Sequence, residues 1–340
     1  AHVLASSLLK QERMKKIVKR ILVFIGINIC LYLIAIVVLI NWPIPQKVPA
    51  KNYDYTSIDT VAVKTYAYHE DWISMRDGAA LFSRRYAANS KTVLLLLHGS
   101  GSESRYLKSL AGRLAQEDLA TVLTPDLRGH GRNLLLHSDI DHIGQLEEDL
   151  EDFIAYAQHE LQAEKIVLAG HSSGGGLVLR YLASAKHPPV DQAILLAPYL
   201  GHDAPTVKAN SGGWVSVGVK RWVGLAMLNG IGVTAYNDKP VLFFNRPKAY
   251  EDPLQAASYS YRMAVNFAPT HYKHDIIKLK TPTLVLVGNA DESFYPERFQ
   301  EVFEPAAAFT EVQRIANANH LNIIKNEEVL MQIRELLLEE

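Results

Sequence analysis

The longest apolar stretch of the chain lies close to its N-terminus. Residues 21–40 carry no charged side chain and are almost wholly aliphatic, a length that can cross the hydrocarbon core of a bilayer as a helix. The positive-inside rule predicts a basic cytoplasmic N-terminus over residues 1–20 and a transmembrane signal anchor over residues 21–41. The basic residues before the stretch are Lys10, Arg13, Lys15, Lys16, Lys19 and Arg20, and those close after it are Lys47 and Lys51.

Two other interpretations of this stretch are open. A cleaved signal peptide has a shorter apolar core, of about 7 to 15 residues, although Val48 and Ala50 supply small residues near a possible cleavage site. A helix of a protein core would be interrupted by polar positions. The anchor and the signal peptide both place the remainder of the chain in the periplasm or outside the cell. We therefore expect a single-pass membrane protein whose folded domain is extracytoplasmic.

A proline-rich segment follows the apolar stretch. Pro43, Pro45 and Pro49 exclude a continuous helix and favour a stiff, extended linker over residues 42–60. The folded domain is then expected over residues 61–340.

Short apolar runs alternate with amphipathic stretches along this domain. Such alternation is typical of an α/β protein with a parallel sheet, and residues 92–97 are apolar on both faces, as in a central strand. A long helix is predicted between the strands expected at residues 120–124 and 166–169, with Ser138 and Asp141 as its cap. The apolar face of that helix holds Ile143, Leu146, Leu150, Phe153, Ile154 and Ala157. The expected strands are residues 92–97, 120–124, 166–169, 192–197, 283–287 and 312–315, preceded by a hairpin of residues 66–75 and 80–86 around Arg76-Asp77-Gly78.

The alternation stops over residues 199–275. This stretch is rich in glycine and tryptophan at first and in proline later. We expect an insertion that forms a cap over the sheet.

A Gly-X-Ser-X-Gly sequence lies between an expected strand and an expected helix. The sequence is Gly170-His171-Ser172-Ser173-Gly174. Three fixed positions occur by chance in many loops, but a strand before and a helix after are what a nucleophile elbow requires. Gly170 and Gly174 would remove the Cβ atoms that clash in so sharp a turn, which leaves the Ser172 hydroxyl exposed for reaction.

Four motifs in the chain resemble those of the α/β-hydrolase superfamily, in the same order. They are His98-Gly99-Ser100-Gly101, Asp126-Leu127-Arg128-Gly129-His130-Gly131, Gly170-His171-Ser172-Ser173-Gly174-Gly175 and Gly288-Asn289-Ala290-Asp291. The resemblance runs from about Val93 to His320 without the insertion, and within the superfamily it is greatest to the monoacylglycerol lipase and lysophospholipase-like branch. It implies an α/β-hydrolase fold, with a mostly parallel eight-stranded sheet, helices on both faces and a cap.

The order of residues along the chain selects a catalytic triad. In this fold the serine comes first, the acid second and the histidine last. Only His320 follows Asp291, which itself follows an apolar strand. Asp203 and Glu292 compete with Asp291 for the role of the acid. The other histidines in the motifs, His98, His130 and His171, precede Ser172 in the chain and are expected to have structural roles.

Backbone N–H groups are expected to stabilise the negative charge that develops on the substrate oxygen. Ser173 begins a helix, so its N–H is one candidate, and Ser100, after Gly99, supplies the second. Loss of one such donor typically costs about 3 to 4 kcal/mol of transition-state stabilisation.

Composition limits the remaining function classes. The net charge of -1 over 340 residues gives no sign of nucleic-acid binding, and the single cysteine, Cys30, lies inside the apolar stretch. We expect no metal, no cofactor and no obligate protein partner. The predicted activity is hydrolysis of a lipid-like carboxylic ester, an acylglycerol or lysophospholipid, through an acyl-enzyme on Ser172. The alternatives are a peptidase or amidase resembling proline aminopeptidases and a noncatalytic, membrane-tethered binding module.

Overall fold

A computed structural model describes residues 2–46, 48, 53, 55, 66–136 and 138–339. Most of the predicted linker, Ala50 of the possible cleavage site, and both Lys47 and Lys51 lie outside these residues. The chain divides into two compact units. One consists of residues 1–44 and 218–237, and the other of residues 45–217 and 238–340.

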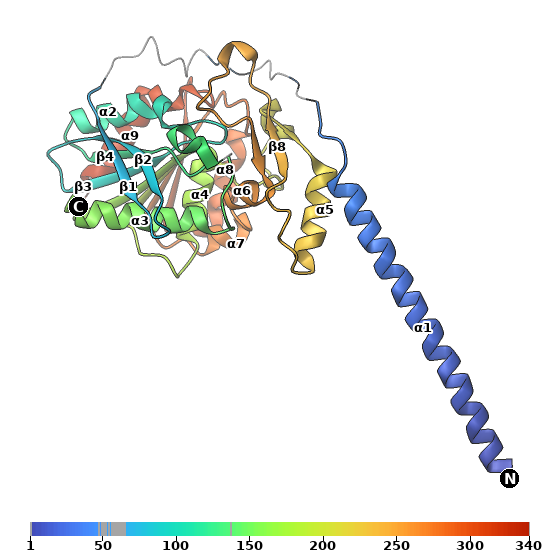
Figure 1. Ribbon diagram of the computed structural model, residues 1–340. Coiled ribbons are helices and arrows are strands. Elements are labelled where there is room, and N and C mark those ends of the chain that lie inside the picture. Colours follow the sequence, from blue (N-terminus) through green and yellow to red (C-terminus); the bar gives the residue numbers. More distant parts are fainter. Residues whose placement is uncertain are drawn as a thin grey trace. The chain divides into compact units, whose positions relative to one another are not determined.

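Eight strands form one sheet in the second unit, in the order β1-β2-β4-β3-β5-β6-β10-β11 (Figure 1). β2 pairs antiparallel with both β1 and β4, and every other neighbouring pair is parallel. The predicted hairpin and the mostly parallel eight-stranded sheet are confirmed. The strands are β1 His69–Ser74, β2 Ala80–Tyr86, β3 Thr92–Leu97, β4 Thr121–Pro125, β5 Lys165–His171, β6 Gln192–Leu196, β10 Thr283–Gly288 and β11 Thr310–Ile315.

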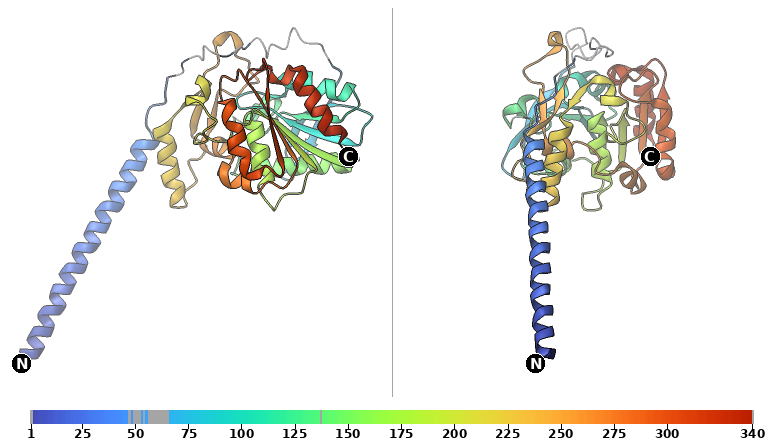
Figure 2. Two further views of the ribbon diagram at one scale, coloured as in Figure 1. Left: turned by 180° about the vertical axis from the view of Figure 1, so that it is seen from behind. Right: turned by 90° about the vertical axis from the view of Figure 1, so that its right-hand side faces the viewer.

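Helices cover both faces of this sheet. α2 (Lys108–Gln116) contacts α9 (Glu327–Leu338), and α3 (Gln145–His159) contacts α4 (Ser173–Leu182). Figure 1 shows the first pair above the sheet and α3 below it, and Figure 2 gives the view from behind. α8 (Phe299–Phe303) packs beside β11. With helices on both faces, the loops that follow the parallel strands lie together at the carboxyl ends of those strands. Sites of open α/β sheets are found at this edge.

The predicted cap of the long helix is wrong. α3 begins at Gln145, its N-cap is Gly144 in the left-handed region at φ 110, and Ile143 lies before the helix with an exposed side chain. The Asn266 side chain accepts hydrogen bonds from the N–H of Gly144 and of Leu146. Because a residue more than a hundred positions away caps this helix, no local Ser-X-X-Asp signal could locate its start.

The insertion between β6 and β10 contains a small sheet of its own. β7 (Val215–Val217), β8 (Pro240–Phe244) and β9 (Ser258–Ser260) pair antiparallel in sequence order. Two short helices follow them, α6 (Tyr261–Asn266) and α7 (Tyr272–Ile277). The remaining helix, α5 (Val219–Gly230), belongs to the other unit.

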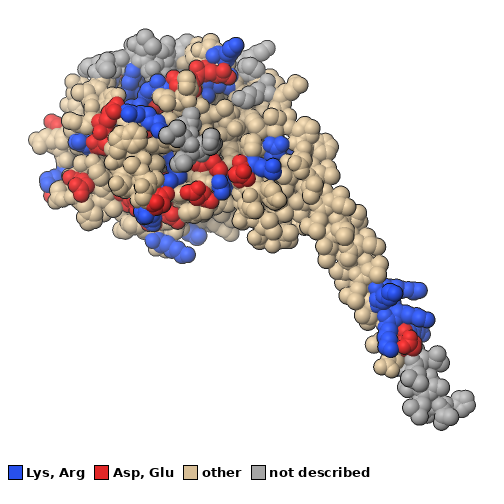
Figure 3. Space-filling model, in the orientation of Figure 1, with Lys and Arg blue, Asp and Glu red and all other residues tan. Residues whose placement is uncertain are grey.

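α1 (His2–Ile40) is one long helix. Its part from Lys10 to Ile40 is, among the described residues, the one helix long and apolar enough to cross a membrane. In Figure 3 the basic side chains of α1 gather toward its N-terminal end, and an uncharged surface follows them. By length and composition α1 fits a membrane anchor or a signal sequence.

Candidate active site

Ser172 lies at a sharp turn between β5 and α4. Its φ and ψ are 55 and -120, a conformation that non-glycine residues rarely adopt, and the Ser172 N–H donates to Leu196 O at 2.9 Å. A Cβ on Gly170 would lie 2.3 Å from the Gly174 carbonyl carbon, and one on Gly174 would lie 2.6 Å from His98 O. Only glycine fits at these two positions, because backbone atoms occupy the space that a side chain would need.

His320 reaches the serine hydroxyl from the loop after β11. His320 Nε2 lies 3.1 Å from Ser172 Oγ, and His320 Nδ1 lies 2.8 Å from Asp291 Oδ2. All three side chains are at least nine-tenths buried. The sequence predicted these three residues as a set, and the structure brings them within hydrogen-bonding distance at the carboxyl edge of the sheet.

Asp291 is held by its own loop. Its Oδ1 accepts hydrogen bonds from the N–H of Ser293 at 2.8 Å and of Phe294 at 2.9 Å, which leaves Oδ2 for His320. These donors fix the orientation of the carboxylate. Of its two competitors in the sequence, Glu292 Oε2 accepts instead from the backbone N–H of His320 at 2.9 Å, and Asp203 has an exposed position within the loop after β6.

The loop after β3 approaches Ser172 closely. A Cβ on Gly99 would lie 3.1 Å from Ser172 Cβ. The Gly99 N–H donates to the Tyr106 hydroxyl at 2.8 Å, and the Gly101 N–H donates to the Tyr259 hydroxyl at 2.6 Å. The N–H of Ser100, between them, has no acceptor among the described residues.

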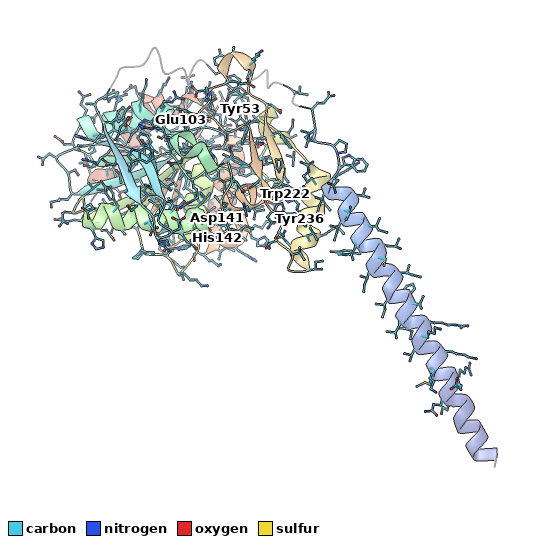
Figure 4. The ribbon with its side chains drawn as sticks, viewed as in Figure 1. Tyr53, Glu103, Asp141, His142, Trp222 and Tyr236 are labelled. Atoms are coloured by element: carbon cyan, nitrogen blue, oxygen red, sulfur yellow. The ribbon has the colours of Figure 1, made fainter. Side chains whose placement is uncertain are left out.

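Tyr53 covers the candidate base. The Tyr53 and His320 rings meet edge to face at 6.2 Å between centroids, and the Tyr53 hydroxyl hydrogen-bonds with Ser211 O and Ser293 Oγ. Burial raises the pKa of Tyr53, so the phenol stays neutral. Figure 4 labels Tyr53 where it approaches the domain. No motif marks this tyrosine, and its place in the predicted linker gave no reason to assign it to the site.

Arg246 is a second residue near the site that the sequence did not reveal. Its Nη2 donates to Gly101 O at 2.9 Å, and its guanidinium lies 5.3 Å from the centre of the Trp214 ring. Its Nε has no hydrogen-bond partner among the described residues. Burial lowers the pKa of Arg246. The guanidinium is therefore a buried cation beside the loop that carries Ser100.

The three histidines of the motifs hold neighbouring loops together. His98 accepts from Leu127 N, His130 bonds to the Tyr259 hydroxyl, and His171 bonds to His320 O at 2.8 Å and to the Tyr106 hydroxyl at 2.9 Å. Burial lowers the pKa of His98, lowers that of His130 further, and brings that of His171 to about 3. All three imidazoles are therefore neutral at neutral pH, and each has a hydrogen bond that supports a loop of the site.

These buried histidines should make the fold sensitive to acid. Their pKa values are depressed in the folded chain and near 6.5 in the unfolded chain, so the unfolded chain binds more protons as pH falls below about 6.5. His171 alone should lower the free energy of unfolding by up to about 1.4 kcal/mol per pH unit there. Denaturant unfolding of the full chain in detergent at about pH 7 and about pH 5 measures this loss.

The control for this prediction is His171→Gln. Burial raises the pKa of Asp149 to about 6, so this carboxyl titrates in the same pH range and its effect on stability has the opposite sign. The contribution of His171 is therefore the difference between the stability losses of the parent and the variant, and not the loss of either protein alone. The variant should lose less stability than the parent between the two pH values. Equal losses in both would mean that His171 does not carry the predicted linkage.

Sequence comparison places the chain in a known family. The family described as serine aminopeptidase, S33, matches residues 88–327, which is more than half of the chain. The chain belongs to this family of α/β-hydrolases. The family assigns the fold and the hydrolase class but not the substrate.

Individual relatives of this S33-family chain are distant. An uncharacterized protein of Mycobacterium bovis is 31% identical over 111 residues, which cover 32% of this chain and 30% of that protein. A bifunctional esterase/perhydrolase of Acinetobacter calcoaceticus is 26% identical over 242 residues, 65% of this chain and 82% of that protein. The chain thus spans less than a third of the mycobacterial relative.

Solved structures agree on the fold. A monoacylglycerol lipase of Paleococcus ferrophilus superposes with a TM-score of 0.52 at 22% identity, over 76% of this chain and 98% of that one. At this identity the likeness extends to the fold alone. The described residues contain no group of three or more His, Cys, Asp or Glu side chains placed to hold a metal ion.

Proposed function

We propose that the chain is a serine hydrolase that cleaves carboxylic esters through an acyl-enzyme on Ser172. One observation carries the proposal: His320 lies 3.1 Å from Ser172 Oγ through Nε2 and 2.8 Å from Asp291 Oδ2 through Nδ1. In this arrangement Asp291 orients the imidazole and stabilises its charged form, and the imidazole acts as a base toward the hydroxyl.

The reaction follows from this geometry in two halves. His320 Nε2 takes the Ser172 proton while Oγ attacks the ester carbonyl carbon, and the proton then passes to the departing alkoxide, which leaves as the alcohol. A water next gives a proton to Nε2 while its oxygen attacks the acyl carbon. Collapse of the second intermediate releases the carboxylic acid and returns the proton to Ser172.

Two backbone N–H groups would stabilise both intermediates. Ser173 is the first residue of α4, so its N–H has no acceptor within the helix. Ser100 is the candidate second donor, because tyrosine hydroxyls occupy the N–H groups of its neighbours Gly99 and Gly101. Donors held in place before the reaction need no reorganisation as charge develops.

The proposed substrate is a lipid-like ester, an acylglycerol or a lysophospholipid. Sequence relatives named as a bifunctional esterase/perhydrolase and, in Mycolicibacterium smegmatis, as a monoacylglycerol lipase support this class. The buried guanidinium of Arg246, whose Nη2 binds Gly101 O beside Ser100, supports the anionic member of the pair, because its positive charge would favour a phosphate in the site. The family description, which names an aminopeptidase, supports a peptidase or amidase as the second candidate.

We further propose that α1 is a retained anchor. The α5 helix packs on α1 within one compact unit, so cleavage after α1 would remove the partner of α5. Retention would make the chain a single-pass protein with residues 1–20 in the cytoplasm and the hydrolase domain on the extracytoplasmic side.

A fluorophosphonate probe tests the nucleophile directly. The folded full chain should form one covalent adduct, and peptide mass spectrometry should locate it on Ser172, whereas denatured chain should remain unlabelled. An adduct on another residue, or none on folded protein, would refute the assignment. Hydrolysis of matched monoacylglycerol, lysophospholipid and amino-acid amide substrates then separates the substrate classes: faster cleavage of the amide would favour the peptidase.

A further inference from the structure

The helix α5 and the residues after it, 218–237, form a hairpin that carries charge only at Lys220 and Arg221, near its start. Residues 222–237 contain no Asp, Glu, Lys or Arg, whereas Lys220 and Arg221 precede them and Asp238 and Lys239 follow. Charges thus flank both ends of a segment that turns back on itself, since the Val233 N–H donates to Leu228 O. In Figure 3 the surface over α5 is correspondingly uncharged below its first turn.

This hairpin packs on α1 closely enough to need a glycine. A Cβ on Gly224 would lie 2.9 Å from the side chains of Leu39 and Ile40 and 3.0 Å from the Ile40 nitrogen. Close contact of two backbones at a small residue is typical of helix pairs in membranes.

The contacts between the two helices have a consistent antiparallel order. Arg221 donates to the carbonyl oxygens of Ile40 and Trp42, and Lys220 lies 3.3 Å from the centre of the Trp42 ring. Further along α5, the Met227 carbonyl accepts from the Tyr32 hydroxyl at 3.1 Å. α5 therefore begins where α1 ends and runs back along it.

Helix geometry gives the distance between these contacts along the axis of α1, and so the depth of α5 in a bilayer that α1 spans. Tyr32 lies eight residues before Ile40 in α1, which at 1.5 Å per residue is roughly 12 Å along the helix axis. The hydrocarbon layer is about 30 Å thick. If α1 spans that layer, Met227 lies well inside it, and Lys220 and Arg221 lie at its surface beside Trp42, an interfacial residue type.

The two asparagine side chains of the hairpin satisfy each other, as hydrocarbon requires. Asn229 Nδ2 donates to Asn237 Oδ1 at 2.7 Å, and Asn237 Nδ2 donates back to Asn229 Oδ1 at 2.9 Å. By contrast, the side chains of Val223, Ile231 and Val233 are exposed. Figure 4 labels Trp222 and Tyr236 in the same hairpin, residue types that favour the membrane interface.

We infer that residues 218–237 form a re-entrant hairpin that enters the bilayer beside α1 and returns on the side of the hydrolase domain. The acyl-chain layer of a phospholipid membrane surrounds this hairpin and covers the exposed side chains of Val223, Ile231 and Val233. The inference rests on α1 being the retained anchor, and not on the chemistry proposed for Ser172. It gives the protein a second membrane segment within the insertion of the hydrolase fold.

Fluorescence quenching in phosphatidylcholine vesicles tests this placement with the full chain. The native Cys30, exposed on α1, carries the label in the parent protein and reports whether α1 lies in the bilayer. Ile231→Cys and Met331→Cys, each with Cys30→Ala, place the same label on the hairpin and on an exposed position of α9. A lipid with a nitroxide on its acyl chain should quench the labels at 30 and 231 several-fold more than that at 331, and aqueous iodide should quench in the reverse order.

Each other outcome overturns the inference. A hairpin label that iodide quenches as well as it does the α9 label would place the hairpin in water. A label shielded from both quenchers would mean that protein, and not lipid, covers residue 231. If the Cys30 label escapes the nitroxide, α1 is outside the bilayer and the hairpin has no membrane partner. Ester hydrolysis by all three labelled proteins is recorded separately, so failure of the proposed chemistry would not be confused with any of these results.

Discussion

Ser172→Ala is expected to lower kcat for ester hydrolysis by roughly a million-fold. The substitution removes Oγ, the atom that we propose as the nucleophile and to which His320 Nε2 is hydrogen-bonded. The fold should survive, because the position at φ 55 is set by the flanking glycines and by the backbone bond from Ser172 N to Leu196 O. Steady-state hydrolysis of a chromogenic ester measures kcat, and unfolding by denaturant, measured in parallel, gives the free energy of unfolding.

Ser173→Ala is the matched control for this prediction. The structure gives the Ser173 side chain no bond to His320 or Asp291, and the role proposed for this residue uses its backbone N–H, which alanine keeps. Its kcat should stay within a few-fold of the parent value. If Ser172→Ala retained turnover while Ser173→Ala lost it, the wrong serine would have been assigned.

Asp291→Asn is expected to reduce kcat by roughly ten thousand-fold with little change in KM. An amide in place of the carboxylate cannot stabilise the imidazolium, and its N–H group turned toward His320 Nδ1 would hold the imidazole in the wrong tautomer. The shape of the side chain is conserved, so Oδ1 can still accept from Ser293 N and Phe294 N. Kinetics of the purified variant over a range of pH measure the loss.

Two other carboxylates test whether the loss is specific to Asp291. Glu292→Gln removes only the charge that faces the His320 backbone N–H, and Asp203→Asn alters the residue that competed for the acid role in the sequence. Both should reduce kcat by less than about ten-fold, since neither side chain bonds the imidazole ring. A loss with Asp203→Asn as large as with Asp291→Asn would move the acid to the loop after β6.

Much of the fold could be predicted because its signals are local. The runs at residues 92–97 and 192–197 became strands β3 and β6 within one residue of their expected limits, since an apolar run between turn residues has few alternatives to a buried strand. The elbow could be located for the same reason, because its motif is contiguous in the sequence and Gly170 faces backbone atoms of Gly174 and Gly175. The backbone atoms that require glycine at Gly174 belong instead to Leu97 and His98, in a distant strand and loop. The catalytic roles of Ser172, Asp291 and His320 stay predictions that the experiments above decide.

Other features depend on contacts between distant parts of the chain. Asn266 determines where α3 begins, the Tyr53 ring covers His320, and Tyr259 holds the loop next to Ser100. The packing of Gly224 on the end of α1 joins residues that lie almost two hundred positions apart. The sequence by itself determined the strands, the order of the motifs and the apolar stretch, because neighbouring residues create those patterns. Only the tertiary structure decided which side chains meet, because a contact between distant segments leaves no periodicity in either of them.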